Sequence, residues 1–176
     1  GSGNVSEQCM WCESANVVHG VSRNVYHVGH SVGGSSGGTS AAVSALGAPI
    51  ALTSDVGGSI RIPAHFNGLF GHKPTGGTTS NVGTLPEAHG RVNNYAQLGP
   101  TARHAEDLFP LLQLMSGPSD IPGGEGTRPD VPVKWLPPAQ ISITKLRILD
   151  MRRLPRTRTL LRVFHQNRDA HIEKAH

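Results

Sequence analysis

Long apolar runs are absent from this sequence of 176 residues. A membrane-spanning helix needs about 20 consecutive apolar residues, and no stretch of the chain comes near that length. No signal peptide is visible either, and the first residue is Gly1 rather than Met. We therefore expect an intracellular fragment or processed product that works in solution. Attachment of a longer form to a membrane stays an open alternative.

Aromatic and basic residues are scarce in most of the chain. Nucleic-acid binding usually relies on both kinds of residue. Aromatic residues make up 5% of the sequence, and residues 1–144 hold seven Lys or Arg against nine Asp or Glu. The excess of positive charge is confined to residues 145–176, with nine basic against three acidic side chains. A nucleic-acid partner is therefore not expected. The basic end is interpreted as a solvated run of charge.

Cysteine is also rare, because the sequence contains only Cys9 and Cys12. Such a pair can be a redox couple or half of a zinc site, but a structural zinc ion takes four ligands and His19 is the only nearby addition. The pair is predicted to be free thiols in a reducing compartment. Neither a metal nor an organic cofactor is expected.

The first part of the chain has the pattern of helices interleaved with short apolar strands. Small residues at 39–46 favour a helix, which Thr39 or Ser40 is placed to cap. The apolar run at 50–53 is typical of a fully buried strand, and a second short strand is expected before Pro74. This alternation indicates an α/β fold, with a mixed sheet flanked by helices.

Loop and helix signals follow in the next part. Glycine, proline and polar residues predict a loop over 75–100, and the residues 102–116 predict a helix. Pro110 either kinks this helix or lies in its first turn. The apolar face of the helix is expected to be core packing, and it consists of Leu108, Leu111, Leu112 and Met115.

Composition divides the chain into three parts. Residues 1–118 are expected to form the folded core, and residues 119–144 are a linker-like segment rich in proline and glycine. Residues 145–176 have no clear fold, although the sequence predicts a short strand at 146–149 and a weakly amphipathic helix over 159–174.

Two glycine-rich loops carry the candidate chemistry, GGSSGG at 33–38 and DVGGSIR at 55–61. Glycine lets consecutive backbone amides face a ligand. A phosphate cradle is a weak interpretation, because neither GxxxxGK[ST] nor GxGxxG occurs. A nucleophile elbow is a second interpretation, since G-x-S-x-G occurs around both Ser35 and Ser36. The residues 24–30 before it nevertheless make a poor strand.

A third interpretation joins both loops, which together resemble the amidase-signature family. The matching segments are GGSSGG, the small-residue helix and SDVGGSIRIP at 54–63. FNG at 66–68 and GHKPT at 71–75 then follow at the family's spacing. The similarity covers residues 1–118 and is greatest to the fatty-acid amide hydrolase branch. It implies a partial amidase-signature fold.

The resemblance also implies roles for residues of both loops. Ser59 would be the nucleophile that attacks an amide carbonyl, and Ser35, on a cis peptide, would relay its proton. The two hydroxyls are then expected within hydrogen-bond range. Asp55, Arg61 and Ser36 would support the loops. The oxyanion hole would be formed by the backbone amides of Val56, Gly57, Gly58 and Ser59.

The base that such a serine needs has no counterpart in the sequence. The family uses a lysine upstream of GGSSGG, whereas none of residues 1–72 is lysine. Lys73 belongs to the GHKPT segment, which does not supply the base in that family. The nearby histidines are interpreted as exposed or packed side chains rather than substitutes; they are His19, His27, His30, His65 and His72.

The sequence therefore predicts a serine hydrolase of the amidase-signature type, present as a truncated chain without its lysine. It would cleave carboxylic amides, fatty-acid amides among them, through an acyl-Ser59 intermediate. Its partner would be a small-molecule amide, lipid-like if the branch resemblance holds. An inactive fragment with a folding or interaction role and a glutaminase-type amidotransferase subunit stay open as alternatives, as does the oligomeric state.

Overall fold

The computed structural model describes residues 1–116, 136, 140–142 and 144. Contacts within the chain divide it into two units, Gly1–Lys134 and Trp135–His176. All helices and strands with assigned bounds belong to the first unit. Most of the linker-like segment, the strand predicted at 146–149 and the helix predicted at 159–174 lie outside the described residues.

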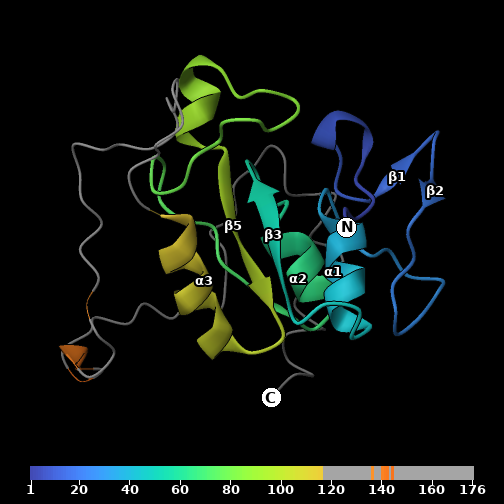
Figure 1. Ribbon diagram of the computed structural model, residues 1–176. Coiled ribbons are helices and arrows are strands. Elements are labelled where there is room, and N and C mark those ends of the chain that lie inside the picture. The colour runs from blue at the N-terminus through green and yellow to red at the C-terminus, as the bar shows by residue number, and fades with distance from the viewer. Residues whose placement is uncertain (117–135, 137–139, 143, 145–176) are drawn as a thin grey trace, which may run out of the picture. The chain divides into compact units, whose positions relative to one another are not determined.

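A three-stranded antiparallel sheet forms the centre of the first unit (Figure 1). Its strands, in spatial order, are β3 (Ile50–Asp55), β5 (Gln97–Ala102) and β4 (Phe70–Gly71). β3 pairs with β5 along its whole length, from Ile50 opposite Ala102 to Asp55 opposite Gln97. β3 therefore ends at Asp55, where the second glycine loop begins.

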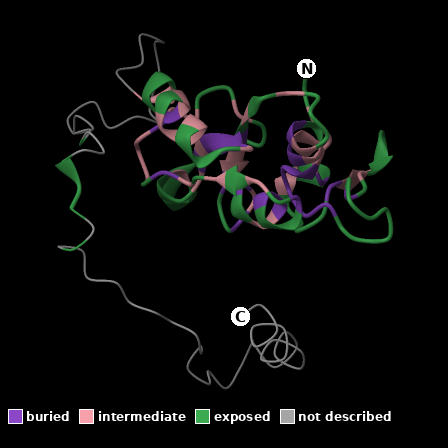
Figure 2. Ribbon diagram, turned by 90° about the horizontal axis from the view of Figure 1, so that it is seen from below, coloured by how far each residue is buried: buried purple, intermediate pink, exposed green. Residues whose placement is uncertain are grey.

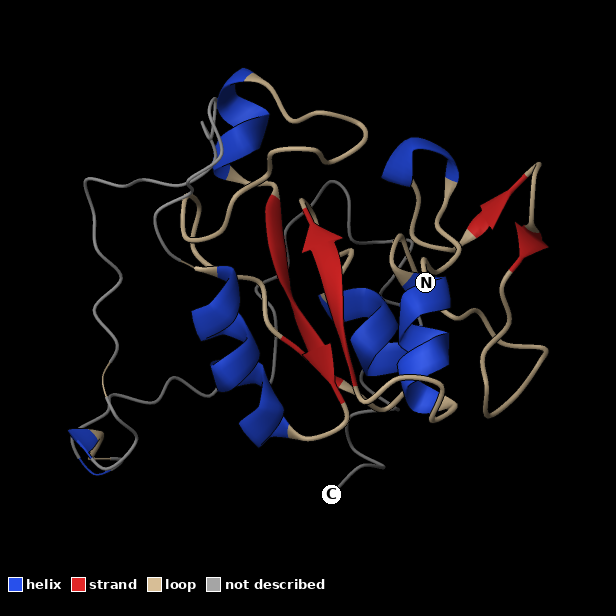
Figure 3. Cartoon of the chain, viewed as in Figure 1, coloured by secondary structure: helices blue, strands red, loops and turns tan. Residues whose placement is uncertain are grey.

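Helices lie on both sides of this sheet (Figures 1 and 3). The α-helices are α1 (Gly37–Ser44), α2 (Arg61–Phe66) and α3 (Leu108–Met115). The 3-10 helices are η1 (Glu7–Cys9), η2 (Gly90–Asn94) and η3 (Ala105–Asp107). α3 contacts β5 on one side, while α1 and α2 lie on the other, where α1 contacts β3 and α2 contacts β4. No helix in the described part of the chain has the length and apolar composition needed to cross a bilayer.

A two-stranded hairpin precedes the first glycine loop. Its strands are β1 (Ala15–Asn16) and β2 (Gly20–Val21), which are antiparallel. The Asn16 side chain closes the turn, because its Oδ1 accepts hydrogen bonds from the amides of Val18 at 3.0 Å and His19 at 2.8 Å. Both residues of β2 are exposed (Figure 2). The hairpin also fixes Ser14, whose carbonyl accepts a 2.9 Å hydrogen bond from the Ser22 amide.

The core combines apolar and polar side chains. Its buried apolar residues are Val32, Val43, Ile60, Ala64, Ala102 and Leu112. Buried polar residues lie among them, and two threonines on neighbouring strands pair with each other. Thr53 on β3 and Thr101 on β5 share a hydrogen bond of 2.8 Å, and Thr53 also donates to the Gly99 carbonyl at 3.1 Å. The burial of these two threonine hydroxyls is tolerated because each has a hydrogen-bond partner.

Several expectations from the sequence are confirmed. The fold is α/β, with strands at 50–55 and 70–71 close to their predicted places. The helix predicted over 102–116 is present as η3 followed by α3, in which Leu112 is buried. Pro110 lies in the first turn of α3, where its missing amide leaves no helical hydrogen bond unmade.

Two expectations are wrong. β3 is not fully buried, because Ile50 and Leu52 are 38% and 56% exposed while Thr53 and Asp55 are buried. Side chains of a strand alternate between its two faces, and only one face of β3 meets the core. The loop predicted over 75–100 contains η2 and most of β5, which is the central strand of the sheet.

Candidate active site

The first glycine loop is buried except at its last residue, Gly38. Residues 33–37 are all buried, and a cis peptide bond joins Gly34 to Ser35. Gly33 has a φ of +80°, and a Cβ there would lie 2.8 Å from the Pro63 backbone in α2. A Cβ at Gly34 would lie 2.5 Å from the Glu13 carbonyl oxygen. Both positions therefore require glycine, because another backbone approaches each of them closely. Gly33 also needs glycine for its positive φ.

The helix that follows this loop is capped from outside it. α1 begins at Gly37, so the prediction that Thr39 or Ser40 caps it is wrong, because both lie inside the helix. The amide of Gly37 instead donates a 2.8 Å hydrogen bond to Ser14 Oγ. The next amide donates to the Asn4 carbonyl at 3.0 Å. The first amides of a helix have no partner within it, and here distant residues provide one.

The second glycine loop is closed by a carboxylate. Asp55 Oδ1 accepts hydrogen bonds from the Gly58 amide at 2.7 Å and from Arg61 Nη2 at 3.0 Å. Asp55 Oδ2 accepts from the Ile60 amide at 3.1 Å and from Arg61 Nε at 3.0 Å. The loop around Ser59 is thus held at both ends by Asp55 and Arg61, with a bidentate ion pair between them.

Burial and hydrogen bonding have opposite effects on the pKa of Asp55. Burial on its own would raise the pKa of this carboxyl, but hydrogen bonds from Arg61 and from the amides of Ile60 and Gly58 outweigh it. The pKa of Asp55 is therefore lowered from its ordinary value of 3.8. The same pairing raises the pKa of Arg61, although the Arg61 side chain is 55% exposed.

This lowered pKa predicts an acid-sensitive contribution to stability. A carboxyl with a depressed pKa in the folded state stabilises the fold above its unfolded pKa, and the contribution is lost as pH falls through the folded value. We expect the stability advantage of the wild type over Asp55→Asn to be constant from about pH 7 to about pH 5 and to shrink below about pH 4. Urea unfolding midpoints measured across that range test it. An advantage that does not change with pH would contradict the assignment.

The two glycine loops meet through the backbone. The Ser36 amide donates a 3.3 Å hydrogen bond to the Ser59 carbonyl. The Ser36 hydroxyl donates a 3.4 Å hydrogen bond to the Ser54 carbonyl. The hydrogen bond expected between the hydroxyls of Ser35 and Ser59 is not formed. Ser35 Oγ is fully buried and has no hydrogen-bond partner among the described residues. The link between the loops is made one residue later than the sequence predicts.

The backbone amides assigned to an oxyanion hole differ in whether they already donate a hydrogen bond within the protein. The Gly58 amide is bound by Asp55, and Gly58 has a φ of +134° that turns the loop. The amides of Val56, Gly57 and Ser59 make no hydrogen bond to another described residue. Gly57 and Val56 are exposed, and a Cβ at Gly57 would meet no atom within 4 Å. Three of the four amides therefore have no hydrogen-bond acceptor among the described residues, and two of them, at Val56 and Gly57, belong to exposed residues.

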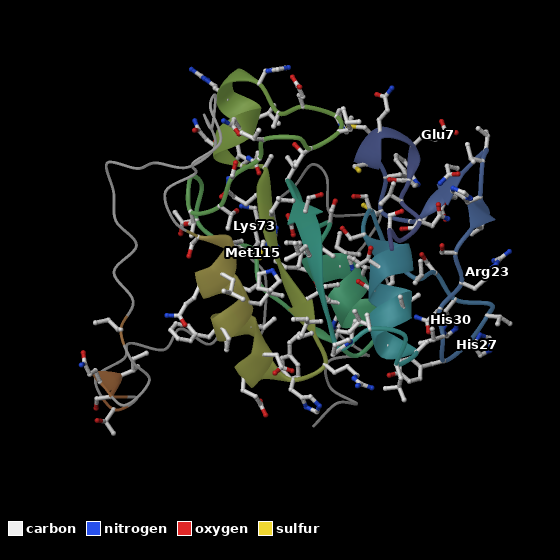
Figure 4. All side chains as sticks on the ribbon, in the orientation of Figure 1. Glu7, Arg23, His27, His30, Lys73 and Met115 are labelled. Carbon is white, nitrogen blue, oxygen red and sulfur yellow. The ribbon has the colours of Figure 1, made fainter. Side chains whose placement is uncertain are left out.

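The histidines near these loops in sequence are all exposed. His27 and His30 stack with their ring centroids 4.4 Å apart, and with Arg23 they lie on the outer edge of the loop that precedes α1 (Figure 4). His65 lies against Phe66 on α2, with centroids 6.2 Å apart. Lys73 is half-buried and follows β4. None of these side chains makes a hydrogen bond to Ser35 or Ser59.

Side chains that could bind a metal ion do not cluster among the described residues. No cluster of three or more His, Cys, Asp or Glu side chains that could hold a metal ion occurs within the described residues. Cys9 and Cys12 are free thiols.

Two positioning residues were given no role on sequence grounds. Ser14 is fully buried and binds the start of α1. Asn67 is also fully buried and joins α2 to the residue just before the first glycine loop. Asn67 Nδ2 donates to the carbonyls of Val32 and Pro63, both at 2.7 Å. Each side chain lies within a segment that matches the family, but its hydrogen bonds are to backbone atoms of other segments. A sequence motif cannot reveal such partners.

This arrangement agrees with the comparison with known families. The family model described as Amidase matches residues 1–158. The chain belongs to the amidase-signature family. The spacing of the two serine loops is therefore a feature of an established fold rather than a chance resemblance.

Relatives with curated names extend this comparison. Over 115 residues the chain is 50% identical to fatty-acid amide hydrolase 2 of Homo sapiens, a match covering 65% of the chain and 22% of that protein. Over 120 residues it is 42% identical to a glutamyl-tRNA(Gln) amidotransferase subunit of Saccharolobus solfataricus, covering 68% of the chain and 24% of that protein. The chain thus spans less than a quarter of the length of these relatives.

Solved structures give the same fold. The structure of 6-aminohexanoate cyclic dimer hydrolase complexed with substrate is similar to the chain with a TM-score of 0.63 and 37% identity, covering 70% of the chain and 25% of that structure. A glutamyl-tRNA(Gln) amidotransferase subunit of Thermotoga maritima has a TM-score of 0.60 and 35% identity, covering 66% of the chain and 25% of that structure. The described residues therefore form part of an amidase-signature fold.

Proposed function

We propose that this chain carries the nucleophile and the proton relay of an amidase that cleaves carboxylic amides through an acyl-Ser59 intermediate. The observation that supports it is the junction of the two glycine loops. Ser59 is half-buried at the turn before α2, and its carbonyl is bound by the residue next to Ser35 at 3.3 Å. The Ser35 hydroxyl, buried beside this junction, has both its hydrogen and its lone pairs available among the described residues.

The chemistry is acyl transfer. Ser59 Oγ forms a bond to the amide carbonyl carbon while its proton passes to Ser35 Oγ, and the Ser35 proton passes on to a base. The carbonyl oxygen gains negative charge, which the unengaged amides of Val56, Gly57 and Ser59 would bind. The Gly58 amide would join them by sharing its hydrogen with Asp55. The amine then leaves with a proton, and water releases the acid from Ser59. Each donor to the oxyanion contributes about 3 kcal/mol of transition-state stabilisation.

The base determines whether this chain is active alone. A serine hydroxyl is a weak nucleophile unless a base accepts its proton. Residues 1–72 contain no lysine, and the histidines near the loops are exposed. A second candidate function, favoured by this missing lysine, is therefore an inactive amidase-like chain with a folding or interaction role.

Fatty-acid amides are the substrate class that the proposal favours. The identity to fatty-acid amide hydrolase 2 is 50%, compared with 42% to the amidotransferase subunit. Met10 and Trp11 are 75% and 69% exposed. They precede Glu13 by three and two positions, and the Glu13 backbone packs against Gly34 of the first glycine loop. Exposed apolar side chains so close to the loop suit a substrate with an apolar acyl chain.

Labelling with a fluorophosphonate tests the proposal. This reagent phosphonylates an activated serine, so we expect the folded chain to take up one label, which peptide mapping places on Ser59. A long-chain acyl amide should slow the labelling, whereas glutamine at the same concentration should not. Circular dichroism of the same sample establishes that the chain is folded.

Each other result has a distinct meaning. A folded chain that takes up no label supports the inactive candidate instead. Protection by glutamine but not by the acyl amide supports a glutaminase-type subunit. Labelling at a serine other than Ser59 would contradict the assignment of the nucleophile.

A further inference from the structure

The Ser14 hydroxyl joins the turn at residues 33–35 to the first turn of α1. Its Oγ accepts the 2.8 Å hydrogen bond from the Gly37 amide, at the start of α1. The same Oγ lies 2.9 Å from the Ser35 carbonyl and 3.1 Å from the Gly33 carbonyl, and it donates to these oxygens. One side chain therefore binds the residues on both sides of the turn that carries the Ser35 hydroxyl.

These hydrogen bonds are buried, so water cannot replace them. Ser14 is 0% exposed, and Ser35 and Gly37 are buried as well. A hydroxyl has one hydrogen and two lone pairs, which matches a single amide donor and two carbonyl acceptors that share one hydrogen. Removal of the hydroxyl would leave a buried amide and buried carbonyls without this partner.

The Ser14 side chain is itself held in place. Its carbonyl accepts hydrogen bonds from the Ser22 amide at 2.9 Å and from Asn4 Nδ2 at 3.3 Å. Asn4 Nδ2 also lies 3.0 Å from Ser22 Oγ and 3.2 Å from the Gly20 carbonyl. The hairpin and the start of the chain thus fix the backbone from which Ser14 projects.

We propose that Ser14 is a positioning residue for acyl transfer: its hydroxyl fixes the turn at residues 33–35 against the start of α1 and so sets where the Ser35 hydroxyl lies. This inference rests on the proposed function of Ser35 and Ser59. Ser14 contacts neither the Ser59 hydroxyl nor the amides assigned to the oxyanion. Its effect is therefore on the rate of the chemical step and not on the affinity for the reagent.

The test measures how the rate of fluorophosphonate labelling depends on reagent concentration. The fit separates the maximal rate from the half-saturating concentration. For Ser14→Ala we expect the maximal rate to fall by about 10- to 100-fold with an unchanged half-saturating concentration, since a small misplacement of a reacting group has that effect. Ser14→Thr keeps the hydroxyl and should restore most of the rate. Ser14→Cys has a somewhat larger side chain with a weakly hydrogen-bonding thiol, so it should fold and remain slow.

A matched control separates positioning from loss of stability. Asn24→Ala removes a buried side chain that binds the carbonyls of Ser31 and Phe66 but does not contact the Ser35 turn. It should lower the unfolding midpoint and leave the maximal labelling rate within about twofold. Equal rate losses in Asn24→Ala and Ser14→Ala, or no rescue by Ser14→Thr, would overturn the proposal.

A wild-type chain that takes up no label would count against the proposed function and not against Ser14. Amide hydrogen exchange then decides the inference. The Gly37 amide should exchange at least tenfold faster in Ser14→Ala and Ser14→Cys than in the wild type and Ser14→Thr, with exchange of the later α1 amides unchanged. Exchange of Gly37 that is the same in all four chains would overturn it.

Discussion

Ser59→Ala is expected to abolish fluorophosphonate labelling, and Ser35→Ala to slow it by two to three orders of magnitude. The first substitution removes the atom that forms the covalent bond. The second removes the hydroxyl that passes the proton on, and a positioned proton-transfer group contributes typically about 10²–10⁴-fold. Time courses of label incorporation in the three chains, followed by peptide mapping, measure both effects. Among the described residues the Ser35 hydroxyl has no hydrogen-bond partner, so Ser35→Ala should cost little stability.

Ser44→Ala is the matched control for these two serines. Ser44 lies in the last turn of α1, where its Oγ donates to the Asn67 carbonyl at 3.0 Å. Its replacement should leave the labelling rate within about twofold, because it touches neither glycine loop. If Ser35→Ala labels as fast as Ser44→Ala, Ser35 is not the relay. If Ser59→Ala still accepts the label, another serine is the nucleophile.

The parts of the site that the sequence predicts are those defined by contiguous residues. The two glycine loops could be found because each is a short motif with a fixed order of glycine and serine. The pairing of Asp55 with Arg61 is also local, since six positions separate them across one turn. The strand leading into the second loop was predicted because its short apolar run is bounded by turn residues.

The central strand β5 could not be predicted for a physical reason. Its sequence contains Gly99 and Pro100, which are usually signals for a loop. In the structure the neighbours of Gly99 require a glycine, and Pro100 is compatible with its place in the sheet. A Cβ at Gly99 would lie 2.8 Å from Ile60 Cδ1 and 3.0 Å from Pro74 Cδ, and the Pro100 carbonyl accepts a 3.0 Å hydrogen bond from the His72 amide. Proline still contributes an acceptor to the sheet although it has no donor.

The start of α1 shows the same limit. Thr39 and Ser40 are suitable capping residues by type, yet neither occupies the cap position. The backbone turn at Ser35 brings the first helical amides toward Ser14 and Asn4 instead. Whether a serine caps a helix depends on which residue turns the chain, and this turn is determined by tertiary contacts.

Asp55→Ala is expected to have the largest effect on stability. The substitution removes the acceptor of the buried Gly58 and Ile60 amides and the partner of Arg61. A buried group left without its partner costs about 1–3 kcal/mol, so the two amides together give an expected loss of about 2–6 kcal/mol in the free energy of unfolding. Arg61 adds little to this loss, because its side chain is 55% exposed and can be solvated by water. Urea unfolding measures the change.

Two further substitutions separate the contributions that the hydrogen bonds and the charge of Asp55 make to stability. Asp55→Asn keeps one oxygen acceptor and loses the charge, so at about pH 7 its loss should be smaller than that of Asp55→Ala. Glu87→Ala removes a carboxylate whose side chain is 65% exposed and should change the free energy of unfolding by less than about 0.5 kcal/mol. If Asp55→Ala is as mild as Glu87→Ala, the loop around Ser59 is held by something other than this carboxylate. If both Asp55 variants also lose labelling while remaining folded, the amides of the loop are active only in the conformation that Asp55 imposes.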